Sequence, residues 1–179
     1  MGCGSMVATV MATVPPLPPP SEGLLLGRTL MRSAWRDLVL SLPGRDAGQL
    51  LRWHEPLLAD CPMDEPALLE ALGHWLRPRG RQLVVVAQDF EGFARHYPRF
   101  TQWRRAWTHG IQALQPEQAA PVTSVPLWLD AQRALEWLEP SLWRARMVSS
   151  PQRLQTMHAE YDVLMQQCVH AWPANTLGL

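Results

Sequence analysis

The sequence contains no lysine, and all sixteen of its basic residues are arginine. Chemistry that needs a lysine amine is therefore excluded: a Schiff base, the lysine of a P-loop or of a protein kinase, and a serine–lysine pair. The arginines are balanced by sixteen acidic residues, so the formal net charge is zero. A neutral chain has no overall attraction to nucleic acid or to an anionic membrane, and any such binding needs a local basic patch.

Cysteine is also scarce, with Cys3, Cys61 and Cys168 as its three instances. Their odd number and the lack of a C-x-x-C spacing predict neither a disulfide framework nor a zinc site, and they indicate a reducing, cytoplasmic compartment. The motifs H-E-x-x-H, G-x-S-x-G and G-x-G-x-x-G are missing as well, which removes the usual signs of a metalloprotease, an α/β-hydrolase or a dinucleotide-binding protein. We expect no cofactor and no metal ion.

Long apolar runs are missing too. The apolar stretch at 6–14 is too short to span a bilayer, and the proline-rich stretch at 15–20 favours an extended polyproline II conformation. We therefore expect no membrane insertion. We interpret 1–21 as a disordered proline-rich tail, 22–170 as one α/β domain and 171–179 as a C-terminal tail.

The clearest positive signal is the unbroken apolar run from Leu83 to Ala87, with three consecutive valines. β-branched side chains suit a pleated strand better than a helix. A strand that is apolar on both faces has to be covered on both faces. The run predicts the central strand of an α/β fold with a single, mostly parallel or mixed sheet flanked by helices.

The rest of the chain shows alternating helical and strand patterns. At the start we expect a helix from Ser21 toward Trp35 and then a strand at 36–42. A further helix is expected to begin at Asp46. Later helices are expected to begin at Asp64, at Glu91 with an interruption at Pro98, and at Ser150-Pro151. Strands are expected at 111–114, 127–130, 133–138 and 143–149.

Three features together resemble a known family. The central strand ends in Asp89, a Pro-Arg-Phe-x-x-Trp-Arg stretch occupies 98–104, and the last helix carries Tyr161-Asp162-x-Leu164. With this order of elements, the chain from about 24 to 170 resembles degenerate phospholipase D-like domains of uncharacterised bacterial proteins. The resemblance implies a fold like one half of a phospholipase D-type pair. It also implies a homodimer, because single-copy domains of that superfamily typically dimerise.

Active members of the superfamily carry H-x-K-x-x-x-x-D, in which the histidine is the nucleophile, the lysine binds phosphate and the aspartate supports the site. The resemblance places Asp130 at the aspartate, so Thr123 and Val125 stand at the histidine and lysine positions. A threonine without an adjacent base is a poor nucleophile, and valine offers phosphate no charge. The resemblance therefore implies a fold that has lost this hydrolytic chemistry.

Two aspartates form one candidate site. Asp89 and Asp130 both follow predicted strands, and α/β sheets bind ligands beyond the carboxyl ends of their strands. A pair of carboxylates there could do general acid–base work. The alternative is that one caps the next helix and the other serves a turn.

The segment from Arg99 to His109 is a second candidate. Its arginines could bind phosphates and its indoles could stack on bases, which is how single-stranded nucleic acid is held. The alternative is that its aromatic residues belong to the core and its basic residues form a solvated face. The basic residues concerned are Arg99, Arg104, Arg105 and His109.

The sequence thus favours a cytoplasmic, non-catalytic binding or interaction module, whose partner is an unidentified protein or a phosphate-bearing ligand. One alternative is a phosphodiester- or nucleic-acid-binding protein that uses the 99–109 segment. Another is an enzyme with carboxylate chemistry at Asp89 and Asp130.

Overall fold

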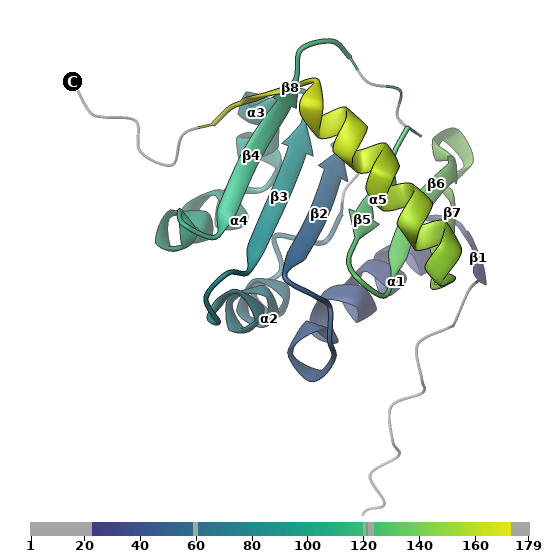
Figure 1. Cartoon of the computed structure of the whole chain (residues 1–179), viewed down its shortest axis with the longest axis horizontal. Coiled ribbons are helices and arrows are strands. Elements are labelled where there is room, and N and C mark those ends of the chain that lie inside the picture. The colour runs from purple at the N-terminus through teal and green to yellow at the C-terminus, as the bar shows by residue number, and fades with distance from the viewer. Residues whose placement is uncertain (1–22, 59–60, 120, 122–123, 173–179) are drawn as a thin grey trace, which may run out of the picture.

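The computed structural model describes residues 23–58, 61–119, 121 and 124–172. Within this part of the chain, eight strands form one open, mixed sheet in the order β1-β7-β6-β5-β2-β3-β4-β8, with helices on both faces (Figure 1). The strands are β1 (Gly23–Leu26), β2 (Leu50–Glu55), β3 (Gln82–Ala87), β4 (Ile111–Pro116), β5 (Trp128–Leu129), β6 (Ala134–Glu139), β7 (Arg144–Val148) and β8 (Cys168–His170). The helices are α1 (Arg28–Leu40), α2 (Pro66–Leu76), α3 (Phe90–His96), α4 (Pro98–Trp103) and α5 (Pro151–Gln166), with short helical turns η1 (Leu42–Gly44), η2 (Arg104–Trp107) and η3 (Pro140–Leu142).

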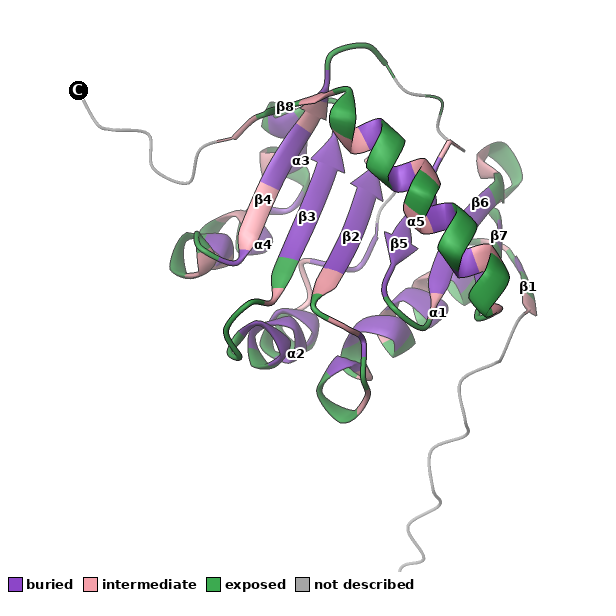
Figure 2. Cartoon of the chain, in the orientation of Figure 1, coloured by how far each residue is buried: buried purple, intermediate pink, exposed green. Residues whose placement is uncertain are grey.

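The valine run forms β3, which lies between β2 and β4 and is parallel to both. All residues from Leu83 to Ala87 are buried, as Figure 2 shows along this strand. Leu83 and Val85 pack into the core on one face of the sheet, whereas Val84 and Val86 pack into the core on the other. The predicted α/β fold with a central strand covered on both faces is confirmed.

The two faces of the sheet carry different layers. Helices α1 to α4 lie behind the sheet in Figure 1, and α5 crosses in front of it. The larger core, between the sheet and α1–α4, contains Trp35, Trp53 and Trp128, and the ring of Trp35 lies edge-on to the other two. The smaller core lies between α5 and the other face of the sheet, and α5 contributes Leu154, Met157, Tyr161 and Leu164 to it.

The predicted order of the first two elements is wrong. Gly23–Leu26 forms the edge strand β1, antiparallel to β7, and Arg28–Leu40 forms one continuous helix. Gly27 between them has a φ of 90°, a conformation that glycine adopts without strain, and the chain turns there. The buried face of α1 continues past Arg36, where a strand was expected to begin, because Leu38 and Val39 follow Met31, Ala34 and Trp35 at helical spacing.

The segment predicted as a helix from Asp46 is also wrong, because Leu50–Glu55 forms strand β2. β2 lies between β3 and β5 in the middle of the sheet, and its successive residues from Leu51 to Glu55 are all buried, so both of its faces are covered. Its polar residues Arg52, His54 and Glu55 are only 5%, 2% and 2% exposed. A strand that is buried on both faces shows no alternation of apolar and polar residues. With polar side chains among its buried residues, its sequence pattern resembles that of an amphipathic helix.

The remaining predicted elements are present. Helices α2 and α5 and strands β4 and β7 lie where they were expected, the β5–β6 hairpin turns at 131–132, and α3 and α4 are separated at Pro98. The structure adds β8, which pairs antiparallel with β4. Ala171 and Trp172 pack against the larger core, so the packed region extends beyond the expected boundary at 170. The expected tail at 1–21 lies outside the described residues, as do residues 173–179.

Candidate functional site

The structure does not bring the two candidate aspartates together. β3 is parallel to β2, whereas β5 is antiparallel to β2, so β3 and β5 run in opposite directions. Asp89 follows the carboxyl end of β3, and Asp130 follows the carboxyl end of β5. The two side chains therefore lie at opposite ends of the sheet. The shared carboxylate site of the enzyme alternative does not form in this fold.

Each aspartate has a local structural role instead. Asp89 caps α3 by accepting a hydrogen bond from the backbone N–H of Gly92 at 2.9 Å. Asp130 serves the β5–β6 turn by accepting from the backbone N–H groups of Gln132 and Arg133 at 2.9 and 3.0 Å. These are the cap and the turn of the alternative interpretation.

Asp130 is fully buried and has further partners. Its two oxygens accept from the guanidinium of Arg45 at 2.8 and 2.5 Å, and one of them also accepts from the indole N–H of Trp128 at 2.9 Å. Val125, at the position that the resemblance gives to the phosphate-binding lysine, is buried in the core under α5. Thr123 lies outside the described residues.

The aromatic residues of the second candidate segment belong largely to the core. Phe100 is completely buried, and Trp103 and Trp107 are half-buried against the larger core. A Cβ atom added to Gly73 of α2 would lie 3.2 Å from the ring of Trp107, which shows how closely η2 packs on α2. These indoles are therefore not a free stacking surface for bases.

Arg104 is not a surface residue, contrary to the prediction. It is 5% exposed, and its guanidinium carbon lies 3.5 Å from the ring centroid of Trp172. Its Nη2 also donates to the carbonyl oxygen of Trp172 at 2.5 Å. Burial lowers the pKa of Arg104 to about 10, and the neighbouring charge of Arg105 contributes. Arg104 holds the segment after β8 against the core.

The other basic residues of that segment lie in two different places. Arg99, at the start of α4, lines a small hollow of about 260 Å³ together with the acidic residues Asp64 and Glu65. Arg105 and His109 are exposed and lie just before the start of β4. The predicted set of four basic residues is therefore not a single contact surface.

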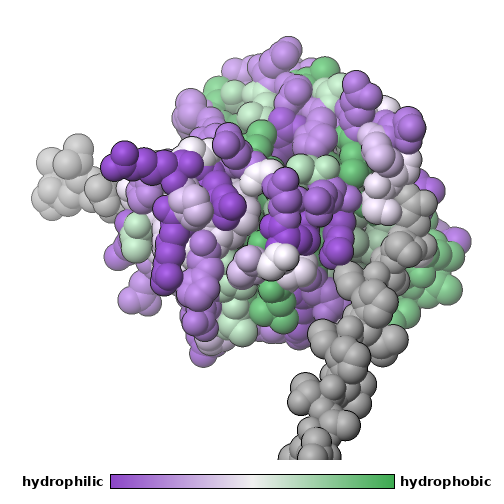
Figure 3. Space-filling model, turned by 60° about the horizontal axis from the view of Figure 1, so that its bottom comes forward, coloured by the Kyte–Doolittle hydropathy of each residue, from purple (hydrophilic) through white to green (hydrophobic). Residues whose placement is uncertain are grey.

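A larger basic surface lies at the amino ends of β3 and β4, and the sequence analysis found only part of it. Two segments build it: the loop from α2 to β3, and η2 together with the loop that leads from it to β4. They are adjacent, because the N–H of Leu83 donates to the carbonyl of Gly110 at 2.8 Å. Figure 3 turns this end of the molecule toward the viewer and shows mainly hydrophilic side chains over it. The basic face, as we call it, consists of Arg77, Arg79, Arg81, Arg105 and His109.

The basic face has few acidic partners. Arg77, Arg79 and Arg105 are exposed and form no ion pair with any carboxylate that the structure describes. Arg81 is held in the loop by the carbonyl of Trp75, to which it donates at 2.8 Å. No aspartate or glutamate occurs in segments 71–88 and 92–116. The arginines that do form ion pairs are Arg32, Arg36, Arg45, Arg52, Arg95, Arg144, Arg146 and Arg153.

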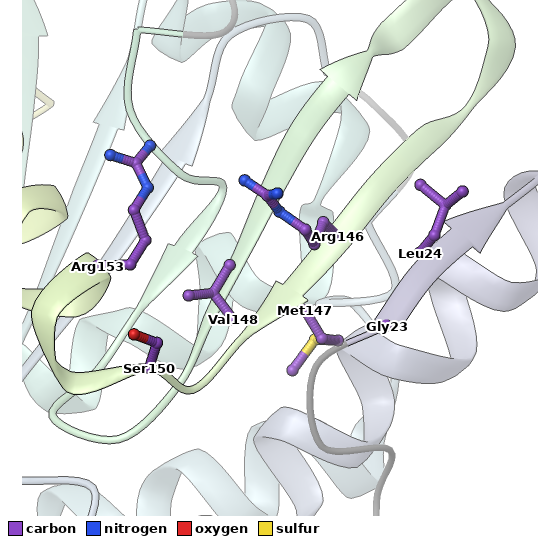
Figure 4. A pocket seen from close by; sticks show the side chains of 7 residues that line it. All are labelled: Gly23, Leu24, Arg146, Met147, Val148, Ser150 and Arg153. Carbon is purple, nitrogen blue, oxygen red and sulfur yellow. The ribbon is translucent and has the colours of Figure 1, made fainter.

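A cavity of about 460 Å³ beside β7 also contains arginines (Figure 4). Arg146 comes from β7 and Arg153 from α5, and both donate to the carboxylate of Glu136. Arg153 donates to Glu160 as well, at 3.3 Å. The positive charges of this cavity are thus neutralised from within the protein, unlike those of the basic face.

Two further findings concern metals and membranes. Among the described residues, no three histidine, cysteine or acidic side chains lie close enough to hold a metal ion. His158 and Asp162, which share a face of α5, both contact the guanidinium of Arg52 instead. None of the described helices is long and apolar enough to cross a bilayer.

Neither a protein-family model nor a curated protein matches the chain. The fold is similar to that of TrmBL2. That protein is an archaeal chromatin protein whose structure shows a novel mode of DNA binding, and it superimposes with a TM-score of 0.60 at 5% sequence identity. The match covers 90% of this chain and 57% of that chain, so this chain spans little more than half of TrmBL2. At such low identity the likeness shows the fold alone.

Proposed function

We propose that this protein is a non-enzymatic nucleic-acid-binding protein that contacts the phosphate backbone through the basic face. The observation that carries the proposal is the segregation of charge: Arg77, Arg79 and Arg105 are exposed without acidic partners, while eight other arginines form ion pairs. Guanidinium groups bind phosphates bidentately, and a local cluster of them suffices for non-specific binding even where the net charge is zero.

The similarity to TrmBL2 agrees with this proposal, because the structure of that protein shows DNA binding. It does not tell which residues of this chain would touch nucleic acid, since so few positions are identical. The choice of the basic face therefore rests on the contacts within this chain. The resemblance to phospholipase D-like domains, the cytoplasmic location and the homodimer stay predictions from the sequence.

The proposal is tested by measuring the affinity for a fluorescent DNA duplex by anisotropy at several salt concentrations. In the variant Arg77→Gln/Arg79→Gln/Arg105→Gln, three exposed charges are removed without touching the core. Each phosphate contact contributes about 0.9 to the steepness with which log K falls against log salt. We therefore expect the slope of the variant to be shallower by roughly 2 to 3. The affinity at low salt should fall at least about tenfold.

The matched control is Arg95→Gln/Arg144→Gln/Arg146→Gln, which removes the same charge from arginines that form ion pairs with Glu91, Glu139 and Glu136. This variant should keep the slope of the unmodified protein. Equal losses in the two triple variants would mean that binding depends on net charge alone, and the basic face would then have no special role. No binding by the unmodified protein at low salt would overturn the proposed function altogether.

A further inference from the structure

A cleft opens beside the basic face, at the edge of the sheet. Strand β8 covers only the second half of β4, since it pairs with Leu114 to Pro116, and Ala171 adds one more bond to the carbonyl of Ala113. The first half of β4 pairs with β3 on its inner edge, and no strand of the described part of the chain covers its outer edge. The space there has a volume of about 620 Å³, which falls within the usual range of about 300–1,000 Å³ for ligand pockets. We call it the edge cleft, and its polar lining includes Gln82, Arg104, Thr108, His109, Gln112 and His170.

The lining of the edge cleft is basic and contains no carboxylate. Its most deeply placed charge is Arg104, whose partners among the described residues are the carbonyl and the ring of Trp172. Neither partner is an anion. A buried guanidinium loses the solvation of its charge, and within a protein it is normally compensated by a carboxylate or another anion. The edge cleft therefore has an unmet preference for a negatively charged ligand.

The edge cleft also has neutral hydrogen-bonding groups. Gln112 of β4 lies opposite Val84 of β3, so Gln82 is its diagonal neighbour on the same face of the sheet, and the amide of Gln82 donates to that of Gln112 at 3.3 Å. The amide nitrogen of Gln112 and the hydroxyl of Thr108 remain as donors in the same lining. Such a set of a cation and several neutral donors is suited to a phosphate group, which presents several acceptor oxygens.

The edge cleft and the basic face are continuous. His109 lines the cleft and belongs to the basic face, and Arg105 of the face is the immediate neighbour of Arg104. A strand that lies across the basic face could therefore end in the cleft. The cavity beside β7 differs, because its two arginines already share Glu136.

We propose that the edge cleft binds the terminal phosphate of a nucleic-acid strand, with Arg104 as its principal contact. The proposal rests on the proposed function, because the basic face guides the strand to the cleft. The same chemistry would accept the phosphate of a free nucleotide, and the experiment has to separate the two sources.

The experiment compares two single-stranded DNA oligonucleotides of the same sequence, one with a phosphate at its first nucleotide and one without. Their affinities for the full chain are measured by fluorescence anisotropy at low salt. Charge-assisted hydrogen bonds are stronger than neutral ones, so the phosphorylated strand should bind at least about tenfold more tightly. Arg104→Met keeps an apolar stem over Trp172 but removes the charge, and it should abolish this preference.

Two controls keep the result interpretable. Arg79→Ala lies on the basic face outside the cleft lining, so it should weaken both oligonucleotides alike and leave their ratio unchanged. If Arg104→Met does not fold, as judged by its thermal transition, Arg104→Gln replaces it, because the glutamine amide can still donate to the carbonyl of Trp172 while the charge is removed. A preference that survives in the folded cleft variant, or no preference in the unmodified protein, would overturn the proposal.

Titration with deoxyadenosine monophosphate, with deoxyadenosine as its control, separates the two sources of phosphate. Binding of the monophosphate without binding of either oligonucleotide would refute both the nucleic-acid function and the strand-end assignment, and it would make the cleft a site for free nucleotides. Binding of both oligonucleotides with equal affinity would refute the assignment of the edge cleft to a terminal phosphate. It would leave the proposed role of the basic face unchanged.

Discussion

Asp130 is a fully buried carboxylate with five hydrogen-bond donors around it: two from Arg45, and one each from Trp128, Gln132 and Arg133. Removal of one partner of a buried ion pair leaves the other charge uncompensated, which typically costs about 3–5 kcal/mol. We expect Asp130→Ala to lower the free energy of unfolding by that amount, measured by urea denaturation.

The matched control for Asp130→Ala is Asp46→Ala, which removes the same group from an exposed loop where it accepts from the N–H of Gly48. Its cost should stay below about 1 kcal/mol. If the two substitutions were equally mild, the Arg45–Asp130 pair would not contribute to stability as its burial suggests.

His54 should make stability depend on pH. It is 2% exposed, and burial lowers its pKa from 6.5 to about 4, while a hydrogen bond to the backbone of Val125 opposes the shift. Between these two pKa values the unfolded chain binds a proton that the folded protein does not. The contribution of neutral His54 to the free energy of unfolding is therefore fully present above pH 6.5. It is lost as the pH falls through the window from 6.5 toward 4, by about 3 kcal/mol in total.

The test compares urea midpoints near neutral pH and near the lower end of this window. His54→Leu should remove most of the decline, whereas His109→Ala, at an exposed position, should leave it unchanged. A smaller decline of the same sign is expected to remain in His54→Leu, because burial also lowers the pKa of His158. An undiminished decline in His54→Leu would show that other groups cause it.

At the scale of elements, the start of α3 depends on Asp89 and Gly92. A Cβ atom on Gly92 would lie 2.2 Å from Oδ2 of Asp89, so a side chain there would displace the capping carboxylate. Alanine is otherwise favoured over glycine in a helix. We expect Gly92→Ala to cost about 1–2 kcal/mol in the unmodified protein and less in an Asp89→Ala background, measured by a double-mutant cycle of unfolding free energies. Equal costs in the two backgrounds would mean that the cap and the glycine act independently.

Elements with a strong local pattern could be predicted from the sequence, and elements whose pattern depends on distant partners could not. β3 has a continuous β-branched run, and α5 has an apolar stripe behind a Ser-Pro start. β2 differs because its buried polar residues have partners far along the chain: Arg52 contacts Asp162 of α5, and Glu55 accepts a hydrogen bond from Tyr97. Strand β8 has three residues, too few for any periodic signal.

At the scale of the whole molecule, the sheet has a narrow joint. In the described part of the chain, the half with β2, β3, β4 and β8 is joined to the half with β5, β6, β7 and β1 by the pairing of β2 with the two residues of β5 and by one bond from the N–H of His54 to the carbonyl of Leu127. Trp35 covers this joint, since its ring centroid lies 5.9 Å from that of Trp53 in one half and 5.7 Å from that of Trp128 in the other. The three indoles thus connect the two halves through the larger core.

We expect the protein to unfold in one cooperative transition, in which far-UV and near-UV circular dichroism coincide. Trp35→Ala should lower the free energy of unfolding by about 3–5 kcal/mol. It should also separate the transition seen in the far-UV signal from that seen in the near-UV signal. Trp75→Ala, which removes an equally buried indole from α2 within one half, should lower stability without separating them. Coincident transitions in Trp35→Ala would show that the backbone pairing of β2 with β5 is enough to couple the halves.

Composition and local pattern were sufficient for the α/β class, the central strand, the later helices and the exclusion of lysine chemistry, because these depend on residue types and on neighbours within a few positions. The tertiary structure decided which arginines form ion pairs and which remain exposed without an acidic partner. Arg45 pairs with Asp130, 85 positions away, and Arg52 with Asp162, 110 positions away. Arg104, equally basic in the sequence, is buried against Trp172, while Arg77, Arg79 and Arg105 remain exposed. An electrostatic surface depends on distances in space, and local sequence does not contain them.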